Sequence, residues 1–138
     1  MKKLQHVLIL AIMSLLLAAC GTTAVTSNKV SDLEGVWNLQ NDGQTTLGIG
    51  NNPITLIFDP SSEDNISGFS GCNNYGGTMS GKSGFISFSN IYSTKMSCPY
   101  LDLEDDYLDL LKQVDRFEVS RKDLYLYKNK LLLLHFKK

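Results

Sequence analysis

Residues 67–81 read SGFSGCNNYGGTMSG and place one of the chain's three cysteines inside a run of glycine and asparagine. Glycine is favoured where the backbone takes positive φ or where two chain segments approach closely. Asparagine tolerates the same backbone region and hydrogen-bonds its own backbone in turns. The composition therefore predicts a tightly turning corner of the fold that holds Cys72 at its centre.

Segments on both sides of this corner have the pattern of short β-strands. Residues 33–40 (LEGVWNLQ) alternate around a tryptophan, residues 54–59 (ITLIFD) are rich in β-branched and aromatic side chains, and residues 85–89 (FISFS) alternate loosely. Residues 41–53 (NDGQTTLGIGNNP) are expected to form a long polar loop. Near the C-terminus, residues 131–136 (LLLLHF) are apolar at successive positions, which predicts a strand covered on both faces.

One segment has helical periodicity instead. Residues 101–114 (LDLEDDYLDLLKQV) place their apolar side chains on one helical face, namely Leu103, Tyr107, Leu110, Leu111 and Val114. The acids near its start suit the positive end of the helix dipole. Strands surrounding a single amphipathic helix predict an α+β fold, an antiparallel sheet with one helix packed on it.

The N-terminus has the features of an export signal. Lys2 and Lys3 precede an apolar run over residues 7–17, which is shorter than the about 20 residues that a transmembrane helix needs. The order Leu17-Ala18-Ala19-Cys20 resembles the lipobox of bacterial lipoproteins. That resemblance implies a lipoprotein signal peptide over residues 1–19, cleaved before a lipidated Cys20.

Beyond the lipid attachment site, residues 20–31 are rich in threonine, serine and asparagine, and are expected to form a flexible tether between the membrane and a domain over residues 32–138. Acyl chains hold a protein at a membrane because each buried methylene contributes about 0.8 kcal/mol. Gly21 follows Cys20 where an acidic residue would favour inner-membrane retention, so the expected location is the outer membrane of a bacterial envelope, on its periplasmic or surface face.

The charge balance argues against nucleic-acid binding. The whole chain has a formal net charge of −1, and the loss of Lys2 and Lys3 with the signal peptide makes it −3. A phosphate-binding surface needs a basic stripe, which this sequence lacks. The expected partners are the membrane, through the N-terminal lipid, and an envelope protein, with the chain itself a monomer.

With Cys20 assigned to lipid, Cys72 and Cys98 have three alternatives: a disulfide, two inert buried thiols, or a reactive thiol. Export from the reducing cytosol favours the disulfide, which would stabilise the fold by roughly 3.5 kcal/mol on the loop-entropy model. A reactive thiol would want a neighbouring histidine or a Cys-x-x-Cys arrangement to lower its pKa, and the sequence offers neither.

Candidate catalytic and metal-binding residues are few. His6 is lost with the signal peptide, and His135 would have to serve alone as the base of a serine hydrolase, with no nucleophile-elbow motif present. One histidine and two widely separated cysteines do not form a zinc ligand set. The acids of residues 102–109 lack the spacing of a calcium loop, and a solvated helix start explains them better. No catalytic residue, metal or cofactor is therefore predicted.

The motifs together resemble the META domain, or HslJ-like, family. The matching positions run in the family's order, Gly71, Cys72, Asn73, Gly77, Thr94, Met96 and Cys98, with Glu104 as the acid of the helix. The opening strand with its tryptophan extends the likeness over residues 32–138. The closing hairpin departs from the pattern, because Lys128-Asn129-Lys130 replaces the usual glycine.

This resemblance implies an antiparallel sheet curled like an incomplete barrel around the helix, with Thr94 and Met96 supporting the Cys72 corner rather than performing chemistry. It implies no reaction. The family includes envelope proteins linked to heat shock and novobiocin resistance, and its fold is similar to that of pilot lipoproteins, which escort secretin subunits to the outer membrane.

Three functional hypotheses follow. The first is a non-enzymatic, lipid-anchored envelope protein that binds a protein or apolar partner and supports the envelope under stress or antibiotic exposure, with pilot-like escort as one form of it. The second is a thiol-based redox protein or enzyme that uses Cys72 or Cys98. The third is a small-ligand binder whose pocket is lined by aromatic side chains, with the candidates Trp37, Tyr75, Tyr92 and Tyr100.

Overall fold

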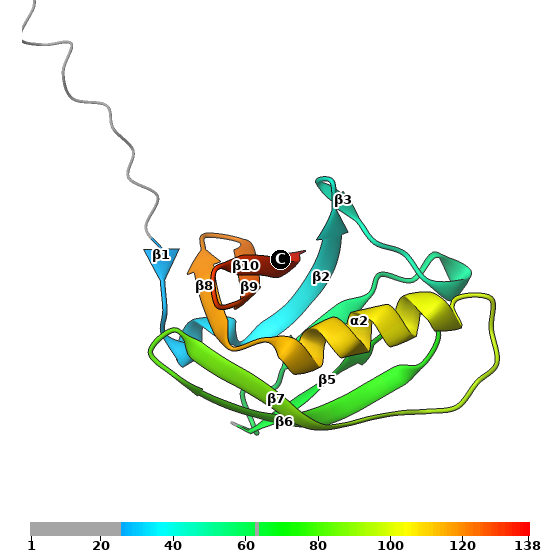
Figure 1. Cartoon of the computed structure of the whole chain (residues 1–138), viewed down its shortest axis with the longest axis horizontal. Coiled ribbons are helices and arrows are strands. Elements are labelled where there is room, and N and C mark those ends of the chain that lie inside the picture. The colour runs from blue at the N-terminus through cyan, green and yellow to red at the C-terminus, as the bar shows by residue number, and fades with distance from the viewer. Residues whose placement is uncertain (1–25, 63) are drawn as a thin grey trace, which may run out of the picture.

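A computed structural model describes residues 26–62 and 64–138 of the chain. The expected signal peptide over residues 1–19, the lipid site Cys20 and residues 21–25 of the tether lie outside the described residues. The described part contains ten β-strands, one α-helix and two short 3₁₀ helices (Figure 1).

The strands form one antiparallel sheet that closes on itself as a ring. The order around the ring is β8, β7, β6, β5, β4, β2, β10 and β9, and β9 pairs with β8 again. Two short strands pair with members of the ring: β1 pairs with β8, and β3 pairs with β2. The bounds are β1 Thr26–Ser27, β2 Gly35–Asn41, β3 Gln44–Thr45, β4 Thr55–Phe58, β5 Asn65–Phe69, β6 Asn74–Lys82, β7 Phe85–Ser93, β8 Arg116–Ser120, β9 Asp123–Lys128 and β10 Leu131–Lys137.

The ring is weakest where β7 meets β8. Phe85 and Arg116 are the one register pair between these strands, and Phe117 N donates to Gly84 O at 2.9 Å beside it. The helix α2 (Leu101–Gln113) lies inside the curve of the sheet and packs on β7 and β10 (Figure 1). The expected curled antiparallel sheet around one helix is therefore confirmed.

Alternation along the strands places the core inside the ring. Trp37 and Leu39 of β2 point inward, and Val36, which precedes Trp37, is 49% exposed on the outer face. The same alternation buries Phe117 and Val119 of β8. Because successive side chains of a strand point to opposite faces, each strand of the ring contributes every second residue to a single apolar core.

The helix presents a slightly different face to the core than its apolar pattern predicts. Glu104, Tyr107, Leu108 and Leu111 are buried, whereas Leu103 and Leu110 lie only partly against the core. The expectation that the acids of this segment are all solvated is wrong for Glu104, which is 3% exposed. Its carboxylate is buried because the Cys72 corner supplies hydrogen-bond donors, described below.

The segment expected as a long polar loop begins with a β-hairpin. Asp42 and Gly43 connect β2 to β3 with φ values of 49° and 79°, as a type I′ two-residue turn requires. The chain then passes through the 3₁₀ helix η2 (Ile49–Asn51) and returns to the core at Ile54, which is fully buried. The Asp-Gly pair is the sequence signal of this hairpin.

The turn between β9 and β10 explains how the chain dispenses with the family's usual glycine. Asn129 has a φ of 55°, which is a conformation that asparagine tolerates better than other residues with a side chain. Its backbone N–H donates to the Asp115 carboxylate at 2.8 Å, and its carbonyl accepts from the Arg116 guanidinium at 3.2 Å. The hairpin therefore keeps its shape with asparagine in the left-handed position.

Two further expectations differ from the structure. Residues 26–31 were expected to belong to the flexible tether, but Thr26 and Ser27 pair with β8 as strand β1, and the 3₁₀ helix η1 (Val30–Leu33) follows. The Ser27 hydroxyl also donates to the Asp32 carboxylate, which fixes this entry to the domain.

The second concerns β10, which was expected to be covered on both faces. Leu134 and Phe136 are buried, but Leu131 and Leu132 are 66% and 46% exposed. A bulge in the β9 pairing between Leu132 and Leu134 ends the regular alternation here. The first two leucines therefore lie at the rim and on the outer face of the sheet.

Candidate functional site

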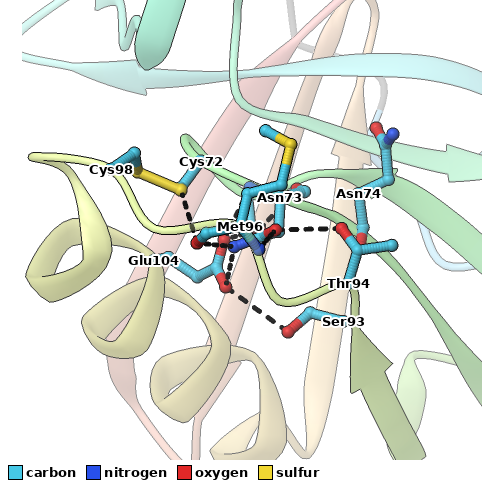
Figure 2. The surroundings of a disulfide bond; sticks show 9 residues. Cys72, Asn73, Asn74, Ser93, Thr94, Met96, Cys98 and Glu104 are labelled. Carbon is cyan, nitrogen blue, oxygen red and sulfur yellow. Dashed lines mark hydrogen bonds between the residues drawn. A yellow bond between two sulfur atoms is a disulfide. The ribbon is translucent and has the colours of Figure 1, made fainter.

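The Cys72 corner is where the family motif residues converge. Cys72, between β5 and β6, is joined to Cys98 in the loop before α2 by a disulfide with a Cα–Cα distance of 6.2 Å (Figure 2). Cys72 is fully buried. Of the three alternatives for these cysteines, the structure contains the disulfide, which connects the corner to the start of the helix.

Asn73 forms most of the polar contacts of this corner. Its Oδ1 accepts hydrogen bonds from the Met96 backbone N–H at 2.7 Å and from the Thr94 hydroxyl at 2.9 Å (Figure 2). Its Nδ2 donates to Glu104 Oε1 at 3.1 Å and to the Met96 carbonyl at 3.3 Å. A fully used amide of this kind fixes three chain segments relative to one another.

Glu104 is the buried charge of the corner, and only neutral groups donate to it. Its Oε2 accepts from the Ser70 hydroxyl at 2.6 Å and from the Asn73 backbone N–H at 2.8 Å. Its Oε1 accepts from Asn73 Nδ2 and, at 3.4 Å, from the Ser93 hydroxyl. A buried carboxylate is tolerated when such donors replace its hydration. These bonds hold α2 against the corner.

Two glycines of the motif are required by space and conformation. Gly71 has a φ of 108°, and a Cβ there would lie 3.3 Å from Ile54 Cδ1. Gly77 lies opposite a bulge of β7, where a Cβ would approach the Ser89 carbonyl to 3.1 Å. A side chain at Gly71 would be strained by this positive φ, and one at Gly77 would press on the backbone of β7. The motif residues thus have a structural explanation, in which Thr94 and the Met96 backbone contact Asn73.

The side chain of Met96 and the sulfur of Cys72 donate no hydrogen bond within the corner. Met96 is 54% exposed, so the corner holds its backbone and leaves its side chain at the surface. Cys72 Sγ lies 3.5 Å from the Met96 carbonyl, but a disulfide-bonded sulfur carries no hydrogen to donate. This is a packing contact.

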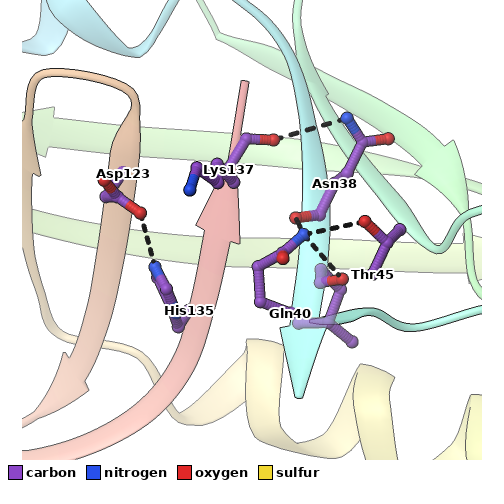
Figure 3. A network of polar contacts seen from close by, with 7 residues as sticks. Asn38, Gln40, Thr45, Asp123, His135 and Lys137 are labelled. Carbon is purple, nitrogen blue, oxygen red and sulfur yellow. Dashed lines mark hydrogen bonds and ion pairs between the residues drawn. The ribbon is translucent and has the colours of Figure 1, made fainter. Parts of the chain in front are cut away.

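His135, the one histidine outside the expected signal peptide, belongs to the outer face of β10. Its Nε2 lies 2.9 Å from Asp123 Oδ1 (Figure 3). Its ring stacks on Tyr125 with a centroid distance of 4.6 Å. Burial, and secondarily the Asp123 charge, raise the pKa of Tyr125. The nearby contacts of Gln40 with Thr45 and Asn38 stabilise the β2–β3 hairpin (Figure 3). His135 has a structural role in these contacts.

A cavity of about 350 Å³ lies at the end of the ring where β1 and η1 enter, and we call it the end cavity. It is bounded by η1, the β4–β5 loop and the last part of β6. Its apolar lining consists of Val30, Leu33, Phe58, Pro60 and Met79, and its polar lining of Ser31, Glu34, Asp59, Ser62, Asp64 and Asn65, with Gly81 completing it. Ligand sites in proteins usually have this size and this mixture of apolar and polar groups.

The acids of the end cavity stand at its exposed edge. Hydrogen bonds from the Ser61 hydroxyl (2.7 Å) and the Ser61 backbone N–H (2.8 Å) reach Asp59 Oδ1. These bonds lower the pKa of Asp59, the hydroxyl contributing most. Asp59 is therefore ionised at neutral pH, and its carboxylate is oriented by the turn that follows β4.

The aromatic residues proposed to line a pocket do not come together. Trp37 is fully buried and Tyr75 is 4% exposed, so both belong to the core. Tyr92 and Tyr100 are exposed at the surface. The end cavity uses other residues, brought together from segments far apart in the sequence, and only the apolar positions of residues 54–58 gave any sequence signal for it.

Glu104 is the site residue whose role the sequence left least defined. It was an acid that matched the family pattern, and the predicted apolar face from Leu103 to Val114 did not include it. Its position three residues before Tyr107 and four before Leu108, on the face that is buried, is the available signal.

The described residues offer neither a cluster of metal ligands nor a membrane-spanning helix. Over residues 26–62 and 64–138, no group of three or more histidine, cysteine or acidic side chains is placed to hold a metal ion. The single α-helix in this range is not long and apolar enough to span a bilayer.

The fold and the disulfide corner define a class of small α+β domain, in which a closed antiparallel sheet surrounds one helix tied to it by a disulfide and a buried glutamate. Residues 31–138 match the model of the META domain, and the chain belongs to that family. The resemblance drawn from the motifs is thereby confirmed.

Solved structures show the same fold. An NMR structure of a protein from Burkholderia xenovorans is 28% identical in sequence, with a TM-score of 0.62, and the match covers 87% of this chain and 94% of that one. A second protein solved by NMR is 22% identical, with a TM-score of 0.60, over 79% of this chain and 93% of the other, and supports the fold alone. No curated protein matches the chain.

Proposed function

We propose that this META domain protein is a lipid-anchored, non-enzymatic protein of the bacterial cell envelope that works by binding an apolar partner. The lipobox order Leu17-Ala18-Ala19-Cys20 supports the anchor. Gly21 supports an outer-membrane location, and the ring, which leaves few strand edges unpaired, supports a monomer.

The observation that carries the binding function is the end cavity. Catalysis would need a nucleophile or base free to react, whereas the residues of the Cys72 corner are engaged in structural bonds: Cys72 with Cys98, and Glu104 with Ser70 and Asn73. The end cavity instead offers apolar walls with polar groups at its edge. That arrangement suits holding a molecule rather than converting it.

Metabolic labelling with a fatty-acid analogue tests the anchor. We expect the wild-type protein to be labelled and a Cys20→Ser variant to be unlabelled. An unlabelled wild type would overturn lipidation, and with it the envelope location. Purification from detergent-solubilised membranes after cross-linking in living cells then tests binding, and a deletion strain tests stress and antibiotic tolerance.

A protein partner, as in pilot-like escort of an outer-membrane protein, is the second candidate, and a row of outer-face residues favours it. Phe85, Arg116, Tyr127 and Leu132 are directly opposite one another across β7, β8, β9 and β10. Phe85 is 64% and Leu132 46% exposed, and exposed apolar side chains around an arginine are typical of protein interfaces. A photo-cross-linking residue at position 85 should capture the outer-membrane protein, whereas one at the solvated helix position 109 should not.

A thiol-based redox function remains the third candidate and has a direct test. It requires a disulfide that a mild reductant opens in the folded protein. Thiol trapping of the native protein should find Cys72 and Cys98 protected, because Cys72 is fully buried. Ready labelling of both residues would favour the redox function over binding.

A further inference from the structure

We propose that the end cavity binds a cationic amphiphile, a molecule with an alkyl or other apolar body and a single positively charged group such as an ammonium. This inference rests on the proposed binding function and specifies the chemistry of its ligand. Two features of the cavity lining support it, the apolar floor and the charge at the edge.

The apolar floor of the end cavity determines which ligand body fits, namely an apolar one. Leu33 and Phe58 are 0% and 3% exposed and form the deepest part of the lining. Val30 and Met79 pack against the core beside them and are only partly buried. These side chains gain contacts from an apolar occupant, and each methylene that it buries is expected to tighten binding roughly threefold to fourfold.

The negative charge at the edge of the end cavity determines which head group the ligand carries, namely a cationic one. Three carboxylates line the cavity, those of Glu34, Asp59 and Asp64, and the lining that the structure describes includes no lysine or arginine. Glu34 follows η1 and Asp64 belongs to the β4–β5 loop, so the carboxylates come from two of the segments that bound the cavity. Phosphate, sulfate or carboxylate groups would be repelled there, and a cation would be attracted.

Two basic side chains, Arg121 and Lys138, belong to a neighbouring groove. Lys138 Nζ donates to the Glu34 carbonyl at 2.5 Å and lies 4.3 Å from the centre of the Trp37 ring. It lines a second, more open depression together with Arg121 and Asp32, which shares Ser31 and Glu34 with the end cavity. Lys138 is thus engaged by backbone and aromatic partners at the Glu34 side, and neither Lys138 nor Arg121 lines the end cavity with Asp59 and Asp64.

The test compares three probes that share an eight-carbon alkyl chain and differ in the head group: octyltrimethylammonium, octyl sulfate and 1-octanol. The two ionic probes are kept below their critical micelle concentrations and octanol below its solubility limit. The protein is the mature chain, residues 20–138, carrying Cys20→Ser so that no attached lipid competes, with its fold verified by a dispersed NMR spectrum. Amide shifts of residues 30, 58 and 79 report binding at the cavity. We expect affinity in the order ammonium, alcohol, sulfate.

Matched variants distinguish an effect of the cavity carboxylates on binding from an effect of the net charge of the protein. The double variant Asp59→Asn/Asp64→Asn should weaken ammonium binding roughly tenfold and leave octanol binding unchanged, because the two lost charges act on the head group alone. The control Asp105→Asn/Asp106→Asn makes the same charge change on the solvated helix face and should alter neither probe. Higher salt should weaken the ammonium probe only.

The outcomes of these experiments distinguish the cationic ligand from the more general proposal of a lipid-anchored binding protein. Equal or tighter binding of octyl sulfate, or ammonium binding that the cavity double variant leaves unchanged, would overturn the cationic ligand. Shifts away from residues 30, 58 and 79 would overturn the cavity as the site. Fatty-acid labelling and partner capture in cells do not depend on these probes, so they would still support the proposed function in either case.

Discussion

At the scale of single residues, Glu104 shows how one buried charge can connect a helix to a corner of a sheet. Both carboxylate oxygens accept hydrogen bonds, Oε2 from Ser70 and the Asn73 backbone, and Oε1 from Asn73 Nδ2. Each donor is neutral, and no described residue forms a salt bridge with Glu104. The stability of the corner therefore depends on both carboxylate oxygens of Glu104, Oε1 and Oε2, being hydrogen-bond acceptors.

Replacement of Glu104 by glutamine should destabilise the protein despite the nearly identical shape. A glutamine has one acceptor oxygen, so in either orientation its amide NH₂ faces a donor, the Asn73 backbone N–H or Asn73 Nδ2. Charge-assisted bonds are lost as well, and we expect the free energy of unfolding to fall by about 2–3 kcal/mol. Urea denaturation measures it. The exposed control Asp105→Asn should change stability by less than about 0.5 kcal/mol, and equal effects of the two would contradict this role of Glu104.

Asn129 permits a second prediction at this scale. Its φ of 55° means that a residue with a Cβ and no adaptable polar group is strained there. Asn129→Ala should lower the free energy of unfolding by about 1 kcal/mol, whereas Asn129→Gly, which restores the family's usual residue, should leave it unchanged or raise it slightly. Thermal unfolding of the two variants gives the comparison, and a glycine variant less stable than the alanine one would contradict the argument.

At the scale of secondary-structure elements, the disulfide joins two segments that the sheet does not pair. Cys72 lies where β5 leads into β6, Cys98 lies in the loop before α2, and the pair closes a loop with a sequence separation of 26. Opening the bond should lower the free energy of unfolding by roughly 3.5 kcal/mol, from loop-closure entropy in the unfolded chain. A Cys72→Ala/Cys98→Ala variant and the reduced wild type should agree, as urea denaturation can show.

A control for the disulfide uses the helix itself. Because Glu104 still connects α2 to the corner, the double alanine variant should keep its fold, with near-native circular dichroism at neutral pH. Loss of the helix in this variant would mean that the disulfide, rather than the glutamate, holds α2 in place.

Local pattern predicted most elements, because their signals are local. Alternation identified β2 at Trp37 and β7 from Phe85, and the apolar period placed the helix within a residue of its observed end. The β2–β3 hairpin had a local signal too, the Asp-Gly pair, which was read as loop. The bulge that exposes Leu132 had none, since it depends on the register with β9.

Sequence pattern could not give what depends on non-local pairing. The ring closes through single contacts such as Phe85 with Arg116, whose partners are set by the whole fold. The end cavity needs Val30, Phe58 and Met79 side by side, and no spacing in the sequence relates them. The motif residues were found because the family resemblance, and not their periodicity, marked them.

At the scale of the whole molecule, the described chain enters the domain beside the end cavity. Residues 30 and 31 line the cavity, and β1 begins only six residues after Cys20 in the sequence. A chain of that length spans at most about 20 Å when fully extended. A lipidated Cys20 would therefore hold the cavity close to the membrane surface, where amphiphiles are concentrated.

The stability of the whole molecule should depend on pH through two core tyrosines. The hydroxyls of Tyr75 and Tyr107 lie 2.7 Å apart, and Tyr75 also donates to the Thr55 carbonyl at 2.9 Å. Burial raises the pKa of Tyr107, and burial together with the neighbouring Tyr107 raises the pKa of Tyr75. Up to about pH 10 these groups keep their protons in both the folded and the unfolded state, so they give no pH dependence.

Above pH 10 the unfolded tyrosines lose their protons while the buried ones keep them, so the unfolded state is favoured. Each buried tyrosine should then lower the free energy of unfolding by about 1.4 kcal/mol per pH unit. Urea denaturation between pH 8 and 12 measures this slope. Tyr107→Phe should reduce the slope by one such increment, although it also removes a hydrogen bond at every pH, whereas Tyr92→Phe, at a 70% exposed position, should not change it. An unchanged slope in Tyr107→Phe would show that the pair titrates alike in the folded and unfolded protein, and that the centre of the ring is open to water.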